Sequence, residues 1–164
     1  MKFSLSNYFY SLSLLQQNIF IALGVITLLA FGLLQIPPRA PKDLSQAVIT
    51  MERGGCPADT CPVYKIAVYG TGKVVYAGIR NVKVVGIQSK DIDSKTVREL
   101  FNAFYASGFP NQTRTVSEQN PELVLSIKLP NHTYRSSFGS EATLVSKKLS
   151  EQIDILTQSS EWVQ

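Results

Sequence analysis

The sequence predicts an α+β protein in which a single N-terminal transmembrane helix is followed by a small antiparallel β-sheet with two helices packed on one face. Three patterns in the 164 residues support this fold class: an uncharged apolar run near the N-terminus, several short segments of alternating apolar and polar residues, and two longer segments with helical spacing. The order of strands, helix, hairpin and helix favours an antiparallel sheet over the parallel sheet of a nucleotide-binding domain.

The apolar run from Ile19 to Ile36 has the length of a membrane span. At about 1.5 Å per residue it would form roughly 27 Å of helix, against a bilayer hydrocarbon core of ~30 Å. Pro37-Pro38 would end this helix, and Arg39 and Lys42 would meet lipid headgroups. We therefore predict an uncleaved signal anchor. The alternative is a cleaved secretory signal, for which Ala30-Phe31-Gly32 is a poor cleavage site.

Charge does not decide the orientation of this anchor, because Lys2 on one side opposes Arg39 and Lys42 on the other. A long downstream domain crosses a membrane largely regardless of its charges, so we expect the domain on the extracytoplasmic side, periplasmic or cell-surface. The predicted parts are an N-terminal tail and transmembrane anchor at residues 1–36, a Pro-rich linker at 37–46 and a soluble α+β domain at 47–164.

The first half of this domain is predicted to form strands. Ala47 to Glu52 is short and β-branched, and Gly54-Gly55 ends it. The alternation from Val63 to Tyr69 is typical of a half-buried strand, with Tyr64, Ile66 and Val68 on one face. After this strand we expect, in order, a tight turn at Gly70-Thr71-Gly72, a partner strand from Lys73 to Ala77 and a further strand from Asn81 to Ile87.

The second half is predicted to contain two helices around a hairpin. The first helix has one apolar stripe, begins at a cap formed by Asp93 or Ser94 and ends at Gly108; the stripe comprises Val97, Leu100, Phe101, Phe104 and Tyr105. A polar loop from Pro110 to Pro121 leads to a hairpin of Glu122 to Leu129 and Thr133 to Phe138. The second helix, Glu141 to Gln158 with Ser140 as cap, is expected to turn inward Leu144, Val145, Leu149, Ile153 and Leu156.

The only two cysteines, Cys56 and Cys61, flank a short loop before the Val63 strand. One interpretation is a disulfide that closes this loop and contributes roughly 2 kcal/mol by loop entropy. A second is a redox dithiol, although four intervening residues differ from the Cys-x-x-Cys of thioredoxins. A metal site is a third, but two cysteines and a single histidine do not complete a four-ligand zinc site. We predict the disulfide, no metal and no cofactor.

The basic residues of the domain are concentrated between Thr60 and Lys90, a stretch without a carboxylate. They are candidates for contact with an anionic surface such as lipid headgroups or a polymer, with a solvated sheet face as the alternative: Lys65, Lys73, Arg80, Lys83 and Lys90. Nucleic acid is not an expected partner, because the lysines are scattered and no reading motif accompanies them.

Two further polar features have simple structural interpretations. His132 lies in the predicted turn Pro130-Asn131-His132, where an exposed polar residue is ordinary. Asp91 and Asp93 precede the first helix, where a carboxylate is favourable as a cap. We find no nucleophile and base in a catalytic pattern.

Four segments of the chain resemble a known family: Glu52-Arg53-Gly54-Gly55-Cys56, Cys61-Pro62-Val63-Tyr64, Val68-Tyr69-Gly70-Thr71-Gly72 and Val75-Tyr76-Ala77-Gly78. They are similar to the bacterial envelope proteins grouped as domain of unknown function 6438, over roughly Ala47 to Phe109. The motif residues are Arg53, Cys56, Cys61, Pro62, Tyr64, Gly70, Gly72 and Tyr76. The chain departs from the pattern by one extra residue between the cysteines and by Thr71 in place of an acidic residue.

This resemblance implies an exported domain, and the family carries no assigned activity. We therefore expect a membrane-anchored extracytoplasmic domain with a non-enzymatic binding or structural role in the bacterial envelope. Its expected partners are the membrane and an envelope protein, an anionic polymer or lipid headgroups. The alternative function is that of a thiol–disulfide enzyme or redox sensor using Cys56 and Cys61.

Overall fold

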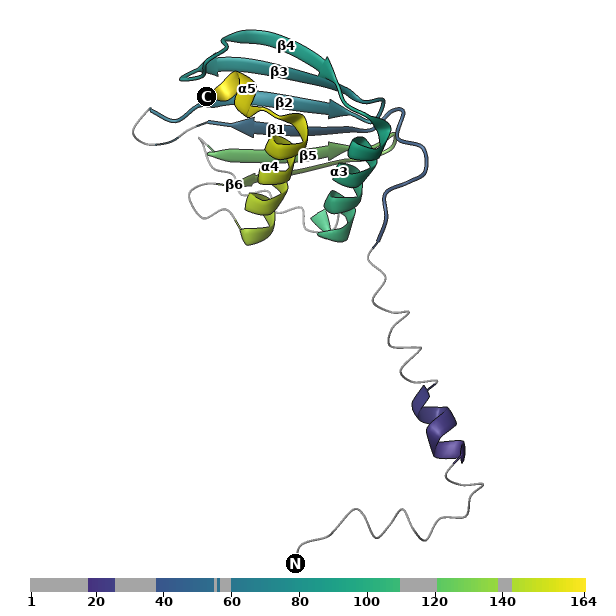
Figure 1. The fold of residues 1–164 in the computed structure, drawn as a ribbon. Helices are drawn as coiled ribbons and strands as arrows, with labels where there is room; N and C mark the ends of the chain where they lie inside the picture. The colour runs from purple at the N-terminus through teal and green to yellow at the C-terminus, as the bar shows by residue number, and fades with distance from the viewer. Residues whose placement is uncertain (1–17, 26–37, 55, 57–59, 110–120, 139–142) are drawn as a thin grey trace, which may run out of the picture. The chain divides into compact units, whose positions relative to one another are not determined.

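A computed structural model of the chain describes residues 18–25, 38–54, 56, 60–109, 121–138 and 143–164 (Figure 1). The chain divides into two compact units, Met1–Pro37 and Pro38–Gln164. Within the second unit, the three helices that Figure 1 labels all lie on the same face of one sheet.

The prediction of a transmembrane helix is wrong. Among the described residues, none of the helices combines the length and the apolar character needed to cross a bilayer. The described helix of the first unit covers residues 18–25, which is about 12 Å of helix against a core of ~30 Å. The signal anchor and the localisation of the domain at a membrane, which depended on this span, are corrected with it. Residues 26–36 of the predicted span lie outside the described residues.

The second unit is α+β, built on one six-stranded sheet of order β4-β3-β2-β1-β5-β6 in which every neighbouring pair is antiparallel. The strands are β1 (Val48–Arg53), β2 (Val63–Tyr69), β3 (Lys73–Arg80), β4 (Gly86–Asp91), β5 (Leu123–Lys128) and β6 (Thr133–Phe138). The first strand is central because β5 returns to pair with its second edge.

The core lies between this sheet and helices α3 (Ser94–Ala106) and α4 (Leu144–Thr157) (Figure 1). Across the sheet, Met51 lies opposite Ile66 on one side and Leu125 on the other, and all three are fully buried. The predicted apolar stripe of α3 is buried at Val97, Leu100, Phe101 and Phe104, with Tyr105 partly buried.

The ends of α3 agree with the prediction. The Asp93 carboxylate accepts hydrogen bonds from the backbone N–H groups of Lys95 and Thr96. Gly108 has a φ of 71°, the left-handed conformation that ends many helices. Part of the following polar loop, residues 110–120, lies outside the described residues.

Helix α4 begins three residues later than predicted. Thr143 is its N-cap, and the predicted cap Ser140 and residue Glu141 lie outside the described residues. The prediction that Leu144 and Val145 face the core is wrong, because their exposed fractions are 70% and 37%. The buried stripe of the helix is formed by Ser146, Leu149, Ser150, Ile153 and Thr157. A short helix that the sequence did not predict, α5 (Ser160–Val163), follows.

The fourth strand begins at Gly86 and not at Asn81 as predicted. Asn81 and Gly86 both have positive φ, so the chain turns between them. This turn is fastened to α5, since the backbone N–H of Val84 donates to the carbonyl of Trp162 at 2.9 Å.

Candidate binding site at the ends of strands β1 and β2

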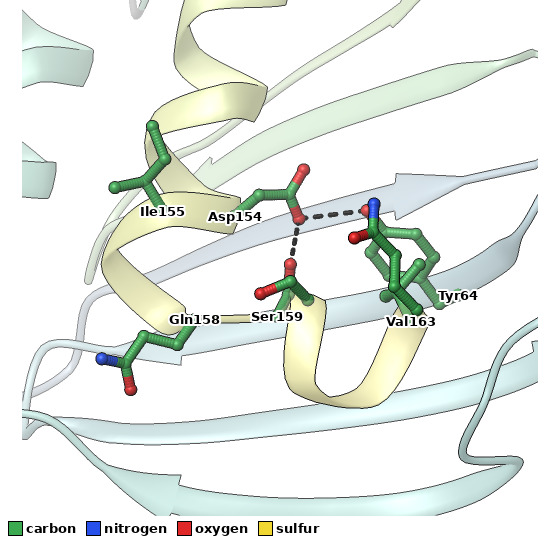
Figure 2. A pocket seen from close by; sticks show the side chains of 8 residues that line it. Tyr64, Asp154, Ile155, Gln158, Ser159 and Val163 are labelled. Carbon is green, nitrogen blue, oxygen red and sulfur yellow. Dashed lines mark hydrogen bonds between the residues drawn. The ribbon is translucent and has the colours of Figure 1, made fainter.

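Four charged or polar side chains converge where β1 ends and β2 begins. Arg53 and Tyr64 lie opposite each other in the β1–β2 register. Both contact Asp154 of α4: Arg53 Nη2 is 3.0 Å from Oδ2, and the Tyr64 hydroxyl donates to Oδ1 at 3.0 Å. Ser159 also donates its hydroxyl to Oδ1, at 2.5 Å (Figure 2). We call these four residues the Asp154 cluster.

The electrostatics of the Asp154 cluster keep the Tyr64 phenol protonated. Tyr64 is 4% exposed, and its burial, reinforced by the charge of Asp154, raises the pKa of its phenol well above the ordinary value, while Arg53 opposes this shift. Tyr64 therefore stays a hydrogen-bond donor. Arg53 also donates from Nη2 to the Ser150 hydroxyl at 3.1 Å. Its buried Nε has no hydrogen-bond partner among the described residues.

A pocket of about 280 Å³ lies beside the cluster on the helix-covered side of the sheet (Figure 2). Its lining consists of Tyr64, Asp154, Ile155, Gln158, Ser159, Ser160, Val163 and Gln164. The only carboxylate among these side chains already accepts hydrogen bonds from Arg53, Tyr64 and Ser159. Three donors therefore hold the Asp154 carboxylate in place at the wall of this pocket.

A second pocket, also of about 280 Å³, is shared between the strand ends and the helix-free face. Its lining consists of Glu52, Arg53, Gly54, Val63, Tyr64, Lys65, Ile79, Pro121 and Val124. Glu52 accepts from Lys65 at 3.1 Å and from Arg135 at 3.4 Å, so two cations share one carboxylate. With Arg53 at the rim, we call this the cationic pocket.

The predicted disulfide is present. Cys56 and Cys61 are joined, with their Cα atoms 5.8 Å apart. The backbone N–H of Cys61 is directed at the sulfur of Cys56 at 3.1 Å, and the Asn81 amide donates to the carbonyl of Cys61. The bridge therefore holds the chain that leads through Pro62 into β2.

The other motif residues support the fold. The N–H of Gly70 donates to the carbonyl of Ala47 at 2.8 Å, and Gly72 has a φ of 103° in the β2–β3 turn. Tyr76 is fully buried between the rings of Tyr64 and Trp162, with centroid separations of 5.8 and 5.1 Å. None of these residues except Tyr64 lines either pocket.

The five predicted cations do not gather at one place. Lys65 is in the cationic pocket, whereas Lys90 contacts Glu161 at 3.3 Å and lies 4.8 Å from the centre of the Trp162 ring. Lys73 lies opposite Asp91 in the β3–β4 register, and Arg80 and Lys83 are exposed near the following turn. Their contact with an anionic surface therefore stays a prediction for each residue separately.

His132 is exposed in the β5–β6 turn, where its ring stacks on Tyr134. Within the described ranges, no three His, Cys, Asp or Glu residues come close enough together to hold a metal ion.

Sequence reasoning missed three residues of the site: Asp154, Ser159 and Arg135. Asp154 carried no usable signal, because it lies four residues after Ser150, whose burial is not visible in the apolar pattern of the helix. Arg135 lies two strands away from Glu52, and nothing local indicated that they would meet.

Comparison with protein-family models matches residues 47–156 to the family described as "Domain of unknown function (DUF6438)". This match covers more than half of the 164 residues. Comparison with curated proteins found no matching sequence.

Proposed function

Because this chain belongs to the family of domain of unknown function 6438, which is described without an activity, we propose its function from the site alone. The domain is a non-enzymatic binding domain that holds an anionic group of its partner in the cationic pocket. The group is a carboxylate or a phosphate, the two anions that guanidinium and ammonium groups recognise.

The observation that carries this proposal is the charge imbalance around Glu52. Among the described residues, Lys65 and Arg135 share this single carboxylate, which leaves one positive charge in excess beside Arg53. Val63, Ile79 and Val124 form apolar walls of the same pocket, and such walls lower the local dielectric and strengthen the attraction of an anion.

The states of the other polar groups favour binding over catalysis. Asp154 is occupied by three donors, and the raised pKa of Tyr64 makes its phenol a poor base at neutral pH. The Asp154 cluster acts in this proposal as a clamp that fixes Arg53 at the rim of the cationic pocket.

The proposal is tested by titrating ¹⁵N-labelled protein with inorganic phosphate, acetate and a triglutamate peptide while following backbone amide signals. We expect saturable shifts at Glu52, Arg53 and Lys65 that weaken with added salt. Arg135→Gln should weaken the binding about fivefold, which is about 1 kcal/mol for an exposed charge contact. Lys147→Gln, which removes an exposed charge from α4, is the control.

The three anions distinguish the class of ligand. Preference for phosphate assigns a phosphorylated partner, and preference for triglutamate assigns an acidic protein segment. Absence of saturable shifts with all three, or an equal loss of affinity in Lys147→Gln, would refute the function.

A second candidate function is thiol–disulfide exchange at Cys56 and Cys61. One contact favours it: the N–H of Cys61 points at the Cys56 sulfur, and an N–H in this position would stabilise a thiolate after reduction. Equilibration in glutathione buffers followed by alkylation and mass measurement gives the reduction potential. A bridge that opens only under strongly reducing conditions identifies a structural disulfide and removes this candidate.

A further inference from the structure

We propose that the free edge of β4 accepts an extended acidic segment of a partner protein as an additional strand. This inference goes beyond the proposed function, because it uses backbone recognition at the sheet edge and not the cationic pocket. Extended peptides commonly bind in this way to exposed sheet edges.

Strand β4 has the geometry needed to pair with an added strand. Among the described residues, it is the terminal strand of the sheet and pairs with β3 alone. All six of its residues keep one unbroken register with β3, from Gly86 opposite Gly78 to Asp91 opposite Lys73. The β2–β3 pairing, by contrast, contains a register shift. A regular edge leaves an unbroken row of outward N–H and C=O groups with which another strand can pair.

Exposed apolar side chains accompany this edge. Ile87 is 75% exposed and lies opposite Ala77 on the helix-free face, where Ile79 of β3, 58% exposed, is its diagonal neighbour. Val85, just before the strand, is 67% exposed. Apolar side chains on alternate positions of an added strand would cover these residues.

The opposite edge of the sheet lacks this feature. Among the described residues of β6, none is an exposed large apolar side chain, and Tyr134 and Phe138 pack against the core. The β4 edge is therefore better suited than the β6 edge to binding an added strand with apolar side chains.

The charges near β4 select an acidic segment. Arg80 and Lys83 are exposed next to Val85, and the first five residues of β4 carry no carboxylate, whereas its last residue, Asp91, lies opposite Lys73. An acidic strand would gain attraction from Lys83, which is exposed beside the start of β4.

The test uses an acetylated, amidated peptide of four Val-Glu repeats, with four Val-Lys repeats as the charge-reversed control. We expect the Val-Glu peptide to bind and the Val-Lys peptide not to bind. Bound peptide should slow hydrogen exchange at alternate backbone amides of β4, because an added strand hydrogen-bonds every second residue of the edge. Binding without this protection would overturn strand addition.

Two substitutions isolate the edge. Ile87→Glu should weaken binding of the Val-Glu peptide at least about tenfold, whereas Leu144→Glu, on the exposed start of α4, should leave it unchanged. Lys83→Gln, which does not alter the strand, should weaken it about fivefold. Equal effects of Ile87→Glu and Leu144→Glu would contradict the proposal.

Two further measurements complete the design. Arg135→Gln should leave binding of the Val-Glu peptide intact, and loss of binding in this variant would assign the peptide to the cationic pocket and overturn the edge site. Sedimentation of the protein alone should show no association through β4. A dimer with the same amide protection would identify a second copy as the occupant, again overturning the proposal.

Discussion

Replacing Asp154 by asparagine removes the charge of the Asp154 cluster while keeping the size of the side chain. The Arg53–Asp154 ion pair is intermediate between surface and interior, with side-chain exposed fractions of 32% and 25%. Exposed pairs contribute up to about 1 kcal/mol, and disrupting a buried pair costs about 3–5 kcal/mol. The hydrogen bond from Tyr64 becomes neutral, which costs about another 1 kcal/mol. We expect Asp154→Asn to lower the free energy of unfolding by about 2–3 kcal/mol.

The assay is urea unfolding followed by the fluorescence of Trp162, the only tryptophan, whose ring packs on Tyr76. With an m value of about 1.5 kcal/mol/M, a loss of 2 kcal/mol lowers the midpoint by roughly 1.3 M. The control is Glu151→Gln, at an exposed position of the same helix, which should change stability by less than about 0.5 kcal/mol.

A double-mutant cycle with Arg53→Gln separates the ion pair from the other contacts. We expect a coupling energy of at least about 1 kcal/mol between the two substitutions. An Asp154→Asn midpoint no lower than that of Glu151→Gln, or additive effects of the two substitutions, would refute the clamp.

Three further predictions concern the motif residues. Replacing Cys56 and Cys61 together by serine should lower the free energy of unfolding by about 2 kcal/mol, measured by urea unfolding, because the unfolded chain gains loop entropy. Stability should fall as pH rises above about 10, because an unfolded tyrosine releases its proton there while Tyr64, with its raised pKa, keeps it; Tyr64→Phe should flatten this slope in unfolding measurements. Gly70→Ala should cost about 2–3 kcal/mol in thermal unfolding, since its Cβ would overlap the carbonyl oxygen of Leu44; an unchanged melting temperature would disprove that crowding.

The parts of the fold that were predicted correctly depend on neighbouring residues. Helix α3 was predicted with both ends because its cap Asp93, its apolar stripe and Gly108 lie within one short segment. The β2–β3 hairpin was predicted for the same reason, from alternation on both sides of Gly70-Thr71-Gly72.

The sequence-based predictions fail where contacts with residues far along the chain determine the local structure. Val82 and Val84 alternate like strand residues, but they pack against the core from a turn that is hydrogen-bonded to Trp162, far along the chain. Leu144 and Val145 are apolar, yet the buried stripe of α4 passes through Ser146 and Ser150, whose hydroxyls donate to backbone carbonyls within or just before the helix. Periodicity counts apolar residues and does not detect a buried serine.

The sequence analysis singled out two of the four residues of the Asp154 cluster. The family motif indicated Arg53 and Tyr64, and the strand register explains their proximity. Their partner Asp154 is 101 residues from Arg53 in the sequence, so no local pattern related the two. The carboxylate of Asp154, which holds Arg53 and Tyr64 in place, is therefore identified only by the folded structure.

The central position of β1 also affects how the chain folds during synthesis. One edge of β1 pairs with β2, which follows soon after it in the sequence. The other edge pairs with β5, which is synthesised much later. Roughly 70 residues separate Arg53 from Leu123, and a ribosome needs about 4–14 s to add them at 5–20 residues per second. During that interval an apolar strand containing Ile49 and Met51 has one unpaired edge. The nascent chain should therefore depend most on chaperones before β5 emerges, and pairing of β5 with β1 should be a late step of folding.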